Sequence, residues 1–81
     1  MLFFFHLAGA VCDPDDEGVE LATISDARIE AVRLASGMLR DRPEMVWLGD
    51  EFRVEVSNED QLLLFTFIAM GVDTPDGKEL A

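Results

Sequence analysis

The sequence predicts a small α+β domain in which one amphipathic helix packs on one face of a mostly antiparallel sheet of about four to five short strands. Three observations predict this fold class: an aromatic-rich apolar run at residues 2–7, a capped helical pattern over residues 24–41, and further extended patterns towards the C-terminus. We expect a single domain over residues 1–68 and a flexible tail over residues 69–81, because the tail contains glycine, proline and several charged residues.

The N-terminal part is expected to contribute three strands. Residues 2–7 are short, aromatic-rich and followed by an alanine and a glycine, which is typical of a strand that ends in a tight turn. We expect residues 10–13 to return as a short strand and residues 18–21 to form another. The intervening residues 13–18 contain proline, glycine and several acids, a composition that favours a turn.

A helix is expected over residues 24–41. Thr23 and Asp26 form a variant of the capping box, in which the threonine hydroxyl accepts a backbone N–H and the acid lies near the positive end of the helix. Pro43 ends the helix because proline lacks an amide hydrogen and disfavours helical geometry at the preceding residue. The apolar residues at helical spacing, which we expect to face the sheet, are Ile24, Ala27, Ala31, Leu34, Ala35 and Met38.

The last two strands have different patterns. In residues 51–57, apolar and charged residues alternate, which predicts one buried and one solvated face. Residues 61–68 are apolar on both faces, so we expect a central strand that is covered on both sides.

One helix cannot cover two faces, and residues 2–7 are also apolar on both sides. The second face must be covered by the connector at residues 45–48, by the tail or by a second molecule, because large apolar patches rarely stay exposed. The connector offers too few side chains, so we expect a symmetric homodimer. The aromatic residues that we assign to this interaction surface are Phe4, Trp47, Phe65 and Phe67.

Composition limits the possible partners and the cellular setting. Seventeen acidic and six basic residues give a net charge of −11, which repels the phosphates of nucleic acids. A single cysteine, Cys12, cannot form an intramolecular disulfide, which favours a reducing cytoplasm. The apolar N-terminal run lacks the basic residues of an export signal, and no run approaches the ~20 apolar residues of a membrane span. We expect a soluble cytoplasmic protein with a protein partner and with no nucleic acid, membrane, cofactor or small-molecule ligand.

Six short segments resemble a family of small bacterial proteins that is common in alphaproteobacteria and described only as a domain of unknown function. The resemblance covers residues 2–68 and implies the α+β fold class and a bacterial cytoplasmic setting, but no mechanism. The chain departs from the family pattern near Gln61, where such proteins usually carry glycine, so a turn that ends in a non-glycine residue or a longer loop is expected. The segments are Phe4-Phe5-His6-Leu7, Asp16-Glu17-Gly18 with Glu20-Leu21, Ala27-Arg28 with Glu30-Ala31, Met38-Leu39-Arg40-Asp41, Trp47 with Gly49, and Arg53-Val54-Glu55-Val56.

Individual polar residues give weak signals of chemistry. His6 is expected to be a structural imidazole on the strand face of Phe4, with a proton carrier as the alternative. Cys12 is expected to be a buried small side chain. For Arg28 and Glu30 we expect packing or ion-pair roles, although a functional role stays open.

The acidic turn resembles part of a calcium loop. Asp13, Asp15, Glu17 and Gly18 match positions one, three, five and six of that loop, but the twelfth position holds Ile24 instead of the bidentate glutamate. We therefore expect a solvated turn and no metal site. Trp47 is expected to pack in the core.

These patterns contain no catalytic constellation. We expect a non-enzymatic protein-interaction module, and the homodimer above is its expected form. The alternative is an antitoxin-like or regulatory subunit that inhibits a basic partner protein, by analogy with small antitoxins that combine a few strands, an acidic glycine turn and one helix.

Overall fold

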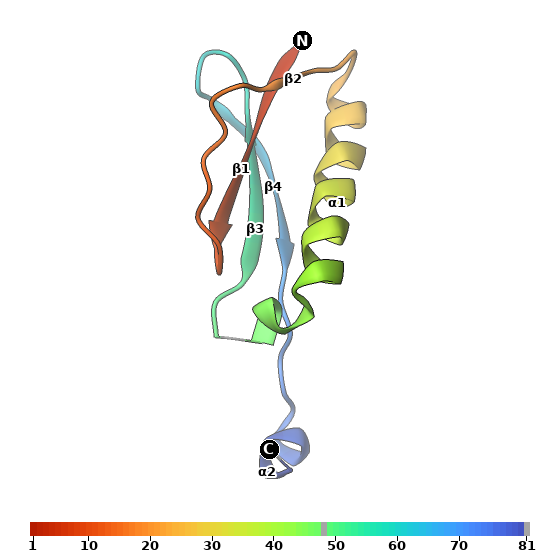
Figure 1. The fold of residues 1–81 in the computed structure, drawn as a ribbon, viewed down its shortest axis with the longest axis vertical. Coiled ribbons are helices and arrows are strands. Elements are labelled where there is room, and N and C mark those ends of the chain that lie inside the picture. Colours follow the sequence, from red (N-terminus) through yellow and green to blue (C-terminus); the bar gives the residue numbers. More distant parts are fainter. Residues whose placement is uncertain (48, 81) are drawn as a thin grey trace.

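The computed structural model describes residues 1–47 and 49–80. It confirms the α+β class: a four-stranded antiparallel sheet in the order β2-β1-β3-β4, with one main helix, α1, along one face (Figure 1). The elements are β1 Leu2–Gly9, β2 Val19–Glu20, α1 Ile24–Asp41, the 3-10 helix η1 Pro43–Trp47, β3 Phe52–Ser57, β4 Leu63–Ala69 and α2 Pro75–Glu79.

Helix α1 begins and ends where the sequence predicts. The Thr23 hydroxyl accepts the Asp26 backbone N–H at 3.1 Å, and the Arg42 N–H closes the other end on the Met38 carbonyl. Pro43 follows directly and starts η1. The buried positions of the helix are all alanines, which have short side chains and so allow the helix to lie close to the sheet: Ala27, Ala31 and Ala35.

The core lies between α1 and the sheet. In β1, Phe3, Phe5 and Leu7 are buried and alternate with half-buried residues that point to the other face. The register places Phe5 opposite Val56 and Leu7 opposite Val54, so the buried rows of the two central strands meet. Each fully buried large apolar side chain contributes about 1.5–3 kcal/mol relative to an exposed one.

The strand that we predicted at residues 10–13 is not formed. Only an isolated bridge joins Leu7 to Asp13, through two backbone hydrogen bonds of 3.0 Å. The chain turns away at Gly9, which has a φ of +79°, and the Ala10 N–H donates to the Glu51 carbonyl on the opposite side of β1. Pro14 has no N–H with which to extend the bridge.

The prediction that residues 61–68 form a central strand is also wrong, because β4 lies at the edge of the sheet. β3 pairs with β1 on one side and with β4 on the other, so both of its edges are occupied, and within residues 1–47 and 49–80 β4 pairs with β3 alone. Its helix-side residues Phe65 and Phe67 pack partly against the core, while Leu63 and Ile68 are 59% and 54% exposed. The apolar residues of β4 therefore include a set that the described part of the chain leaves exposed.

The connector and the tail meet beyond the end of the sheet. Met45 of η1 is fully buried in the core on the α1 side, and Leu48 lies outside the described residues. Trp47 is 58% exposed, so the prediction that it packs in the core is wrong; its ring lies against Gly71, whose N–H donates to the Val46 carbonyl at 3.2 Å. Helix α2 has no buried residue and stands off from the sheet (Figure 1), and the flexibility of residues 69–81 stays a prediction.

Candidate functional site

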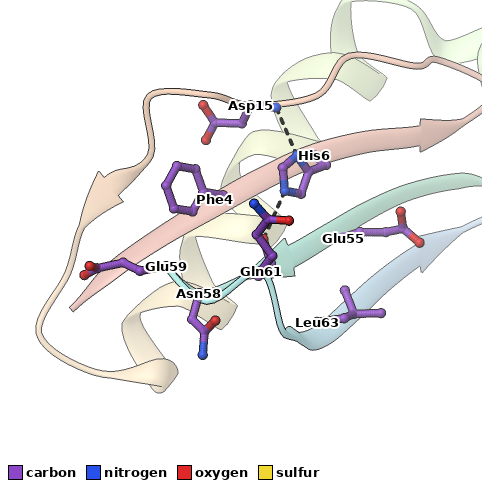
Figure 2. Close-up of a pocket in the computed structure, with 9 residues that line it drawn as sticks. Phe4, His6, Asp15, Glu55, Asn58, Glu59, Gln61 and Leu63 are labelled. Atoms are coloured by element: carbon purple, nitrogen blue, oxygen red, sulfur yellow. Dashed lines mark hydrogen bonds between the residues drawn. The ribbon is translucent and has the colours of Figure 1, made fainter.

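The sheet face opposite α1, here called the open face, holds a cavity of about 460 Å³ at the end where β1 meets the β3–β4 hairpin. It lies within the ~300–1,000 Å³ range of small-ligand pockets. Strand β1 contributes Phe4 and His6, whose rings are stacked at 9° with centroids 6.4 Å apart. Figure 2 shows the residues that line this His6 cavity: Phe4, His6, Asp15, Glu55, Ser57, Asn58, Glu59, Gln61 and Leu63.

Both nitrogens of the His6 ring have hydrogen-bond partners. Nδ1 accepts the backbone N–H of Asp15 at 3.0 Å, and Nε2 lies 3.0 Å from the Ser57 hydroxyl oxygen (Figure 2). Because Nδ1 is an acceptor here, Nε2 carries the ring hydrogen of the neutral imidazole and donates it to Ser57. A base that activates a serine needs the opposite tautomer, with a free lone pair on Nε2. This geometry supports a structural imidazole that holds the loop of residues 10–18 against β1.

Asp15 fastens the same loop through its carboxylate. Oδ2 accepts the Phe5 N–H at 3.1 Å, while Oδ1 accepts the N–H groups of Glu17 and Gly18 at 3.0 and 3.2 Å. Partial burial raises the pKa of Asp15, but these three N–H groups and the nearby His6 lower it by more, so the pKa lies below its usual value. Both oxygens are occupied by backbone amides, and within the described residues no group of three acids, histidines or cysteines is placed to bind a metal.

A strained turn closes the cavity on the hairpin side. The Gln61 N–H donates to the Asn58 carbonyl at 3.0 Å, and the Asn58 side chain accepts the N–H groups of Asp60 and Leu62. Gln61 has a φ of +62°, in the left-handed region that favours glycine, so the turn ends in a non-glycine residue as one of our two alternatives predicted. This backbone conformation places the Gln61 side chain on the cavity (Figure 2).

The cavity is acidic. Asp15, Glu55 and Glu59 line it, and its lining residues include no lysine or arginine. Arg53, which shares the open face with Glu55, pairs with Glu51 and lies 3.7 Å from Glu55. The electrostatic field at the cavity therefore favours a cation over an anion.

The free edge of the sheet is the second candidate site. Strand β4 has no partner on its outer side among the described residues, and residues 61–72 contain no charged side chain. Natural proteins usually protect such an edge with charges, prolines or a covering segment. The large apolar side chains around this edge that are more than half exposed are Leu62, Leu63, Ile68 and Met70.

The structure does not gather the four aromatic residues that we assigned to one interaction surface. Phe4 lies on the open face, Phe65 and Phe67 lie half-buried on the α1 side of β4, and Trp47 lies at the far end beside Gly71. Only the two β4 residues belong to the free edge.

Three other expectations concern residues away from these sites. Cys12 is exposed, so the prediction that it is buried is wrong. Glu30 pairs with Arg33 at 3.4 Å on the exposed side of α1, an ion pair that adds little stability. Arg28 is exposed beside Ile29 and Val32.

Sequence reasoning missed Ser57 and Gln61 as residues of one site. The departure from glycine at position 61 was the available signal for Gln61. Ser57 gave none, because it lies 51 residues from His6 along the chain.

The architecture defines a small α+β domain whose four-stranded antiparallel sheet is covered by a helix on one face. The family described as Domain of unknown function (DUF6894) matches residues 2–70, and the chain belongs to this family. The match includes all four strands and α1, and it confirms the resemblance to a domain of unknown function. No curated protein and no solved structure matches the chain. None of the helices in the described residues has the length and apolar character to cross a membrane.

Proposed function

We propose that this chain is a non-enzymatic protein-interaction module that self-associates through the free edge of β4. The observation that carries the proposal is that this edge is long and uncharged and has no partner strand among the residues that the structure describes, while apolar side chains beside it are exposed. An uncharged edge matters here because each copy has a net charge of −11, and two copies repel each other wherever their acidic side chains come close together. The edge is a surface on which two such copies can meet.

The energetics favour a partner at this surface. Leu63 and Ile68 are 59% and 54% exposed, so covering them contributes at most about half of the ~1.5–3 kcal/mol that full burial of such a side chain is worth. Backbone hydrogen bonds across the edge add about 1 kcal/mol each. These gains are counted on both copies of a two-fold dimer, which helps them exceed the cost of association, about 4 kcal/mol or more.

The absence of enzymatic activity is part of the proposal. His6 and Ser57 are the residues that most resemble a catalytic pair, and the tautomer of His6 leaves no base for the Ser57 hydroxyl. We further propose that the protein acts in the cytoplasm of an alphaproteobacterium. The motif segments of the sequence and its single free thiol, Cys12, support this setting.

Light scattering coupled to size exclusion tests self-association. At micromolar concentration we expect twice the 9.0 kDa chain mass for the natural sequence and a monomer for Ile68→Lys, which places a charge on the free edge. The matched control is Val32→Lys, because Val32 is 45% exposed on α1, away from the edge, and should leave the dimer intact. A natural chain that is monomeric up to about 100 µM, a concentration at which even weak dimers form, would overturn the proposal.

A regulatory subunit that binds a basic partner is the second candidate, and the acidic His6 cavity favours it. Glu55 and Glu59 would face the cation of an arginine side chain, whose stem would pack against Phe4 and Leu63. Titration of the chain with an arginine-rich peptide, followed by NMR of the His6 ring, tests this candidate. If a peptide of the same length without lysine or arginine causes the same chemical-shift changes in the His6 ring, the cavity does not recognise a cation and this candidate is wrong.

A further inference from the structure

The hydrogen bonds of β1 determine which way every amide in the sheet points. The N–H groups of Phe5 and Leu7 donate to the loop of residues 10–18, with distances of 3.1 and 3.0 Å. Because successive residues of a strand point their N–H and carbonyl groups to opposite sides, His6 and its alternate neighbours face β3. His6 pairs with Glu55, so Glu55 in turn faces β1.

The same alternation fixes the outer edge of β4. Val54, next to Glu55, faces β4 and pairs with Phe67 in a hydrogen-bonded pair. Thr66 and Ile68, on either side of Phe67, therefore direct their N–H and carbonyl groups outward, where the described residues supply no partner. These four polar groups are the unsatisfied backbone groups of the free edge.

A bulge limits the regular part of this edge. Phe65 pairs with Val56 and Leu63 pairs with Ser57, so Leu64 is an extra residue outside the ladder. The regular edge runs over residues 65–69, and Phe67 is its middle residue.

We infer that a second copy of this chain adds to β4 as an antiparallel strand, with the two-fold axis beside Phe67. Thr66 of each copy then forms a hydrogen-bonded pair with Ile68 of the other copy, which satisfies all four outward groups on both edges. The inference rests on the proposed self-association and gives it a register.

The side chains agree with this register. On the α1 side, Phe67 of one copy lies opposite Phe67 of the other, and Phe65 lies opposite Ala69, a large residue against a small one. On the open face, Ile68 lies opposite Thr66, so part of its exposed surface is covered.

Charge identifies a second copy as the occupant. A basic partner would be attracted to the acids of the 10–18 loop or the His6 cavity, whereas residues 61–72 offer it no carboxylate. An acidic copy of the same chain meets the least repulsion along this stretch. Two sheets joined here form one continuous sheet without a free β4 edge.

Disulfide trapping tests the register in a Cys12→Ser background. We compare Thr66→Cys alone, Ile68→Cys alone, and the two variants mixed and exchanged before mild oxidation with oxidised glutathione. In the inferred register the Cα atoms of Thr66 and of Ile68 in the other copy lie about 5.5 Å apart, within the ~4.4–6.8 Å range of disulfides. Thr66 of one copy and Thr66 of the other are offset by two positions, about 7 Å along the strand, and so are the two copies of Ile68. Identical residues are therefore too far apart to form a disulfide.

We expect the mixture to give a disulfide between unlike chains, with each variant alone giving at least about tenfold less linked dimer. Efficient linkage of Thr66→Cys with itself would overturn the register, because it requires an axis at Thr66, but it would support self-association at this edge. If light scattering shows a dimer and no linkage occurs, the dimer uses another surface and the inference is wrong. If the natural chain is monomeric, the inference and the proposed function both fail.

Discussion

The two sides of the sheet differ: the outer side of β1 is largely covered by its own chain, whereas the outer edge of β4 is free among the described residues. Along the outer side of β1, the two residues of β2 pair with Leu2 and Phe3, the Asp15 carboxylate accepts the Phe5 N–H, and Asp13 bonds both backbone groups of Leu7. At the β4 edge, the outward groups of Thr66 and Ile68 have no partner in the described part of the chain, and no charge protects them. The comparison shows that an acidic loop can replace a full strand at an edge. Where no such loop is present, a second chain is the natural substitute.

The largest expected effect is at the β4 edge. Thr66→Pro removes an N–H that the monomer does not use, and two-fold symmetry removes it twice from the dimer. We expect the dissociation constant of the dimer to rise at least about 100-fold, which corresponds to about 3 kcal/mol of dimerisation free energy. Sedimentation equilibrium over a dilution series measures this change.

Thr66→Val is the matched control for this prediction. It keeps the N–H and a β-branched side chain, so it should dimerise like the natural chain. Equal affinity for the proline and valine variants would show that the outward N–H of Thr66 makes no bond between copies.

At the β1 edge we expect an effect on stability and none on dimerisation. Asp15→Ala removes the acceptor for the N–H groups of Phe5, Glu17 and Gly18. The unfolding free energy should fall by about 2 kcal/mol, because part-exposed hydrogen bonds contribute about 1 kcal/mol or less each. Urea unfolding is measured in the monomeric Thr66→Pro background, so that the loss of unfolding free energy is not mixed with dimer dissociation.

Asp16→Ala is the control for Asp15. Asp16 is an exposed neighbour of the same charge, and its replacement should change the unfolding free energy by no more than about 0.5 kcal/mol. If both variants lose the same stability, the effect comes from the charge of the loop and not from the bonds to β1.

Acid should remove the contribution of Asp15. The backbone N–H groups hold the pKa of this carboxyl below its usual value of 3.8 in the folded chain, in spite of its partial burial. A lowered folded pKa gives stability that is fully present above the usual value and is lost as the pH falls through the folded pKa. The difference in unfolding free energy between the natural chain and Asp15→Ala should therefore be constant above about pH 5 and should narrow below about pH 4. A difference that widens in acid would contradict this assignment.

The elements that sequence periodicity predicted well are those with one buried face. The alanine stripe of α1 and the alternation of Phe52, Val54 and Val56 each define a face, and the structure confirms both. Periodicity does not identify the neighbours of a strand, so β4 was expected in the middle of the sheet and lies at its edge.

The candidate sites were less predictable because they depend on contacts between distant segments. Asp15 was noticed for its calcium-like spacing, whereas its role follows from the loop lying against the amide of Phe5. The His6–Ser57 bond joins residues that are 51 positions apart and requires the register of β1 with β3. Two signals were available: the strand period placed His6 on the same face as Phe4, and Gln61 replaces an expected glycine.

The smallest expected effect is at the turn that leads into β4. Gln61 adopts a φ of +62°, which costs a non-glycine residue about 1–2 kcal/mol, and Gln61→Gly removes that strain. Glycine also gives the unfolded chain more conformational freedom, which costs about 0.4–1 kcal/mol. We expect a net stabilisation of about 0.5 kcal/mol in urea unfolding of the monomeric Thr66→Pro form.

Gln61→Ala separates the backbone of this residue from its side chain. Alanine keeps the strain and removes the amide that lines the His6 cavity, so this variant should be no more stable than the natural chain. If Gln61→Gly were instead destabilised along with Gln61→Ala, contacts of the amide would outweigh the backbone strain. The Gln61 side chain would then stabilise the turn next to β4, as the Asp15 side chain stabilises the loop next to β1. The two sides of the sheet would in that case differ only in the outward backbone groups of β4, which have no partner among the described residues.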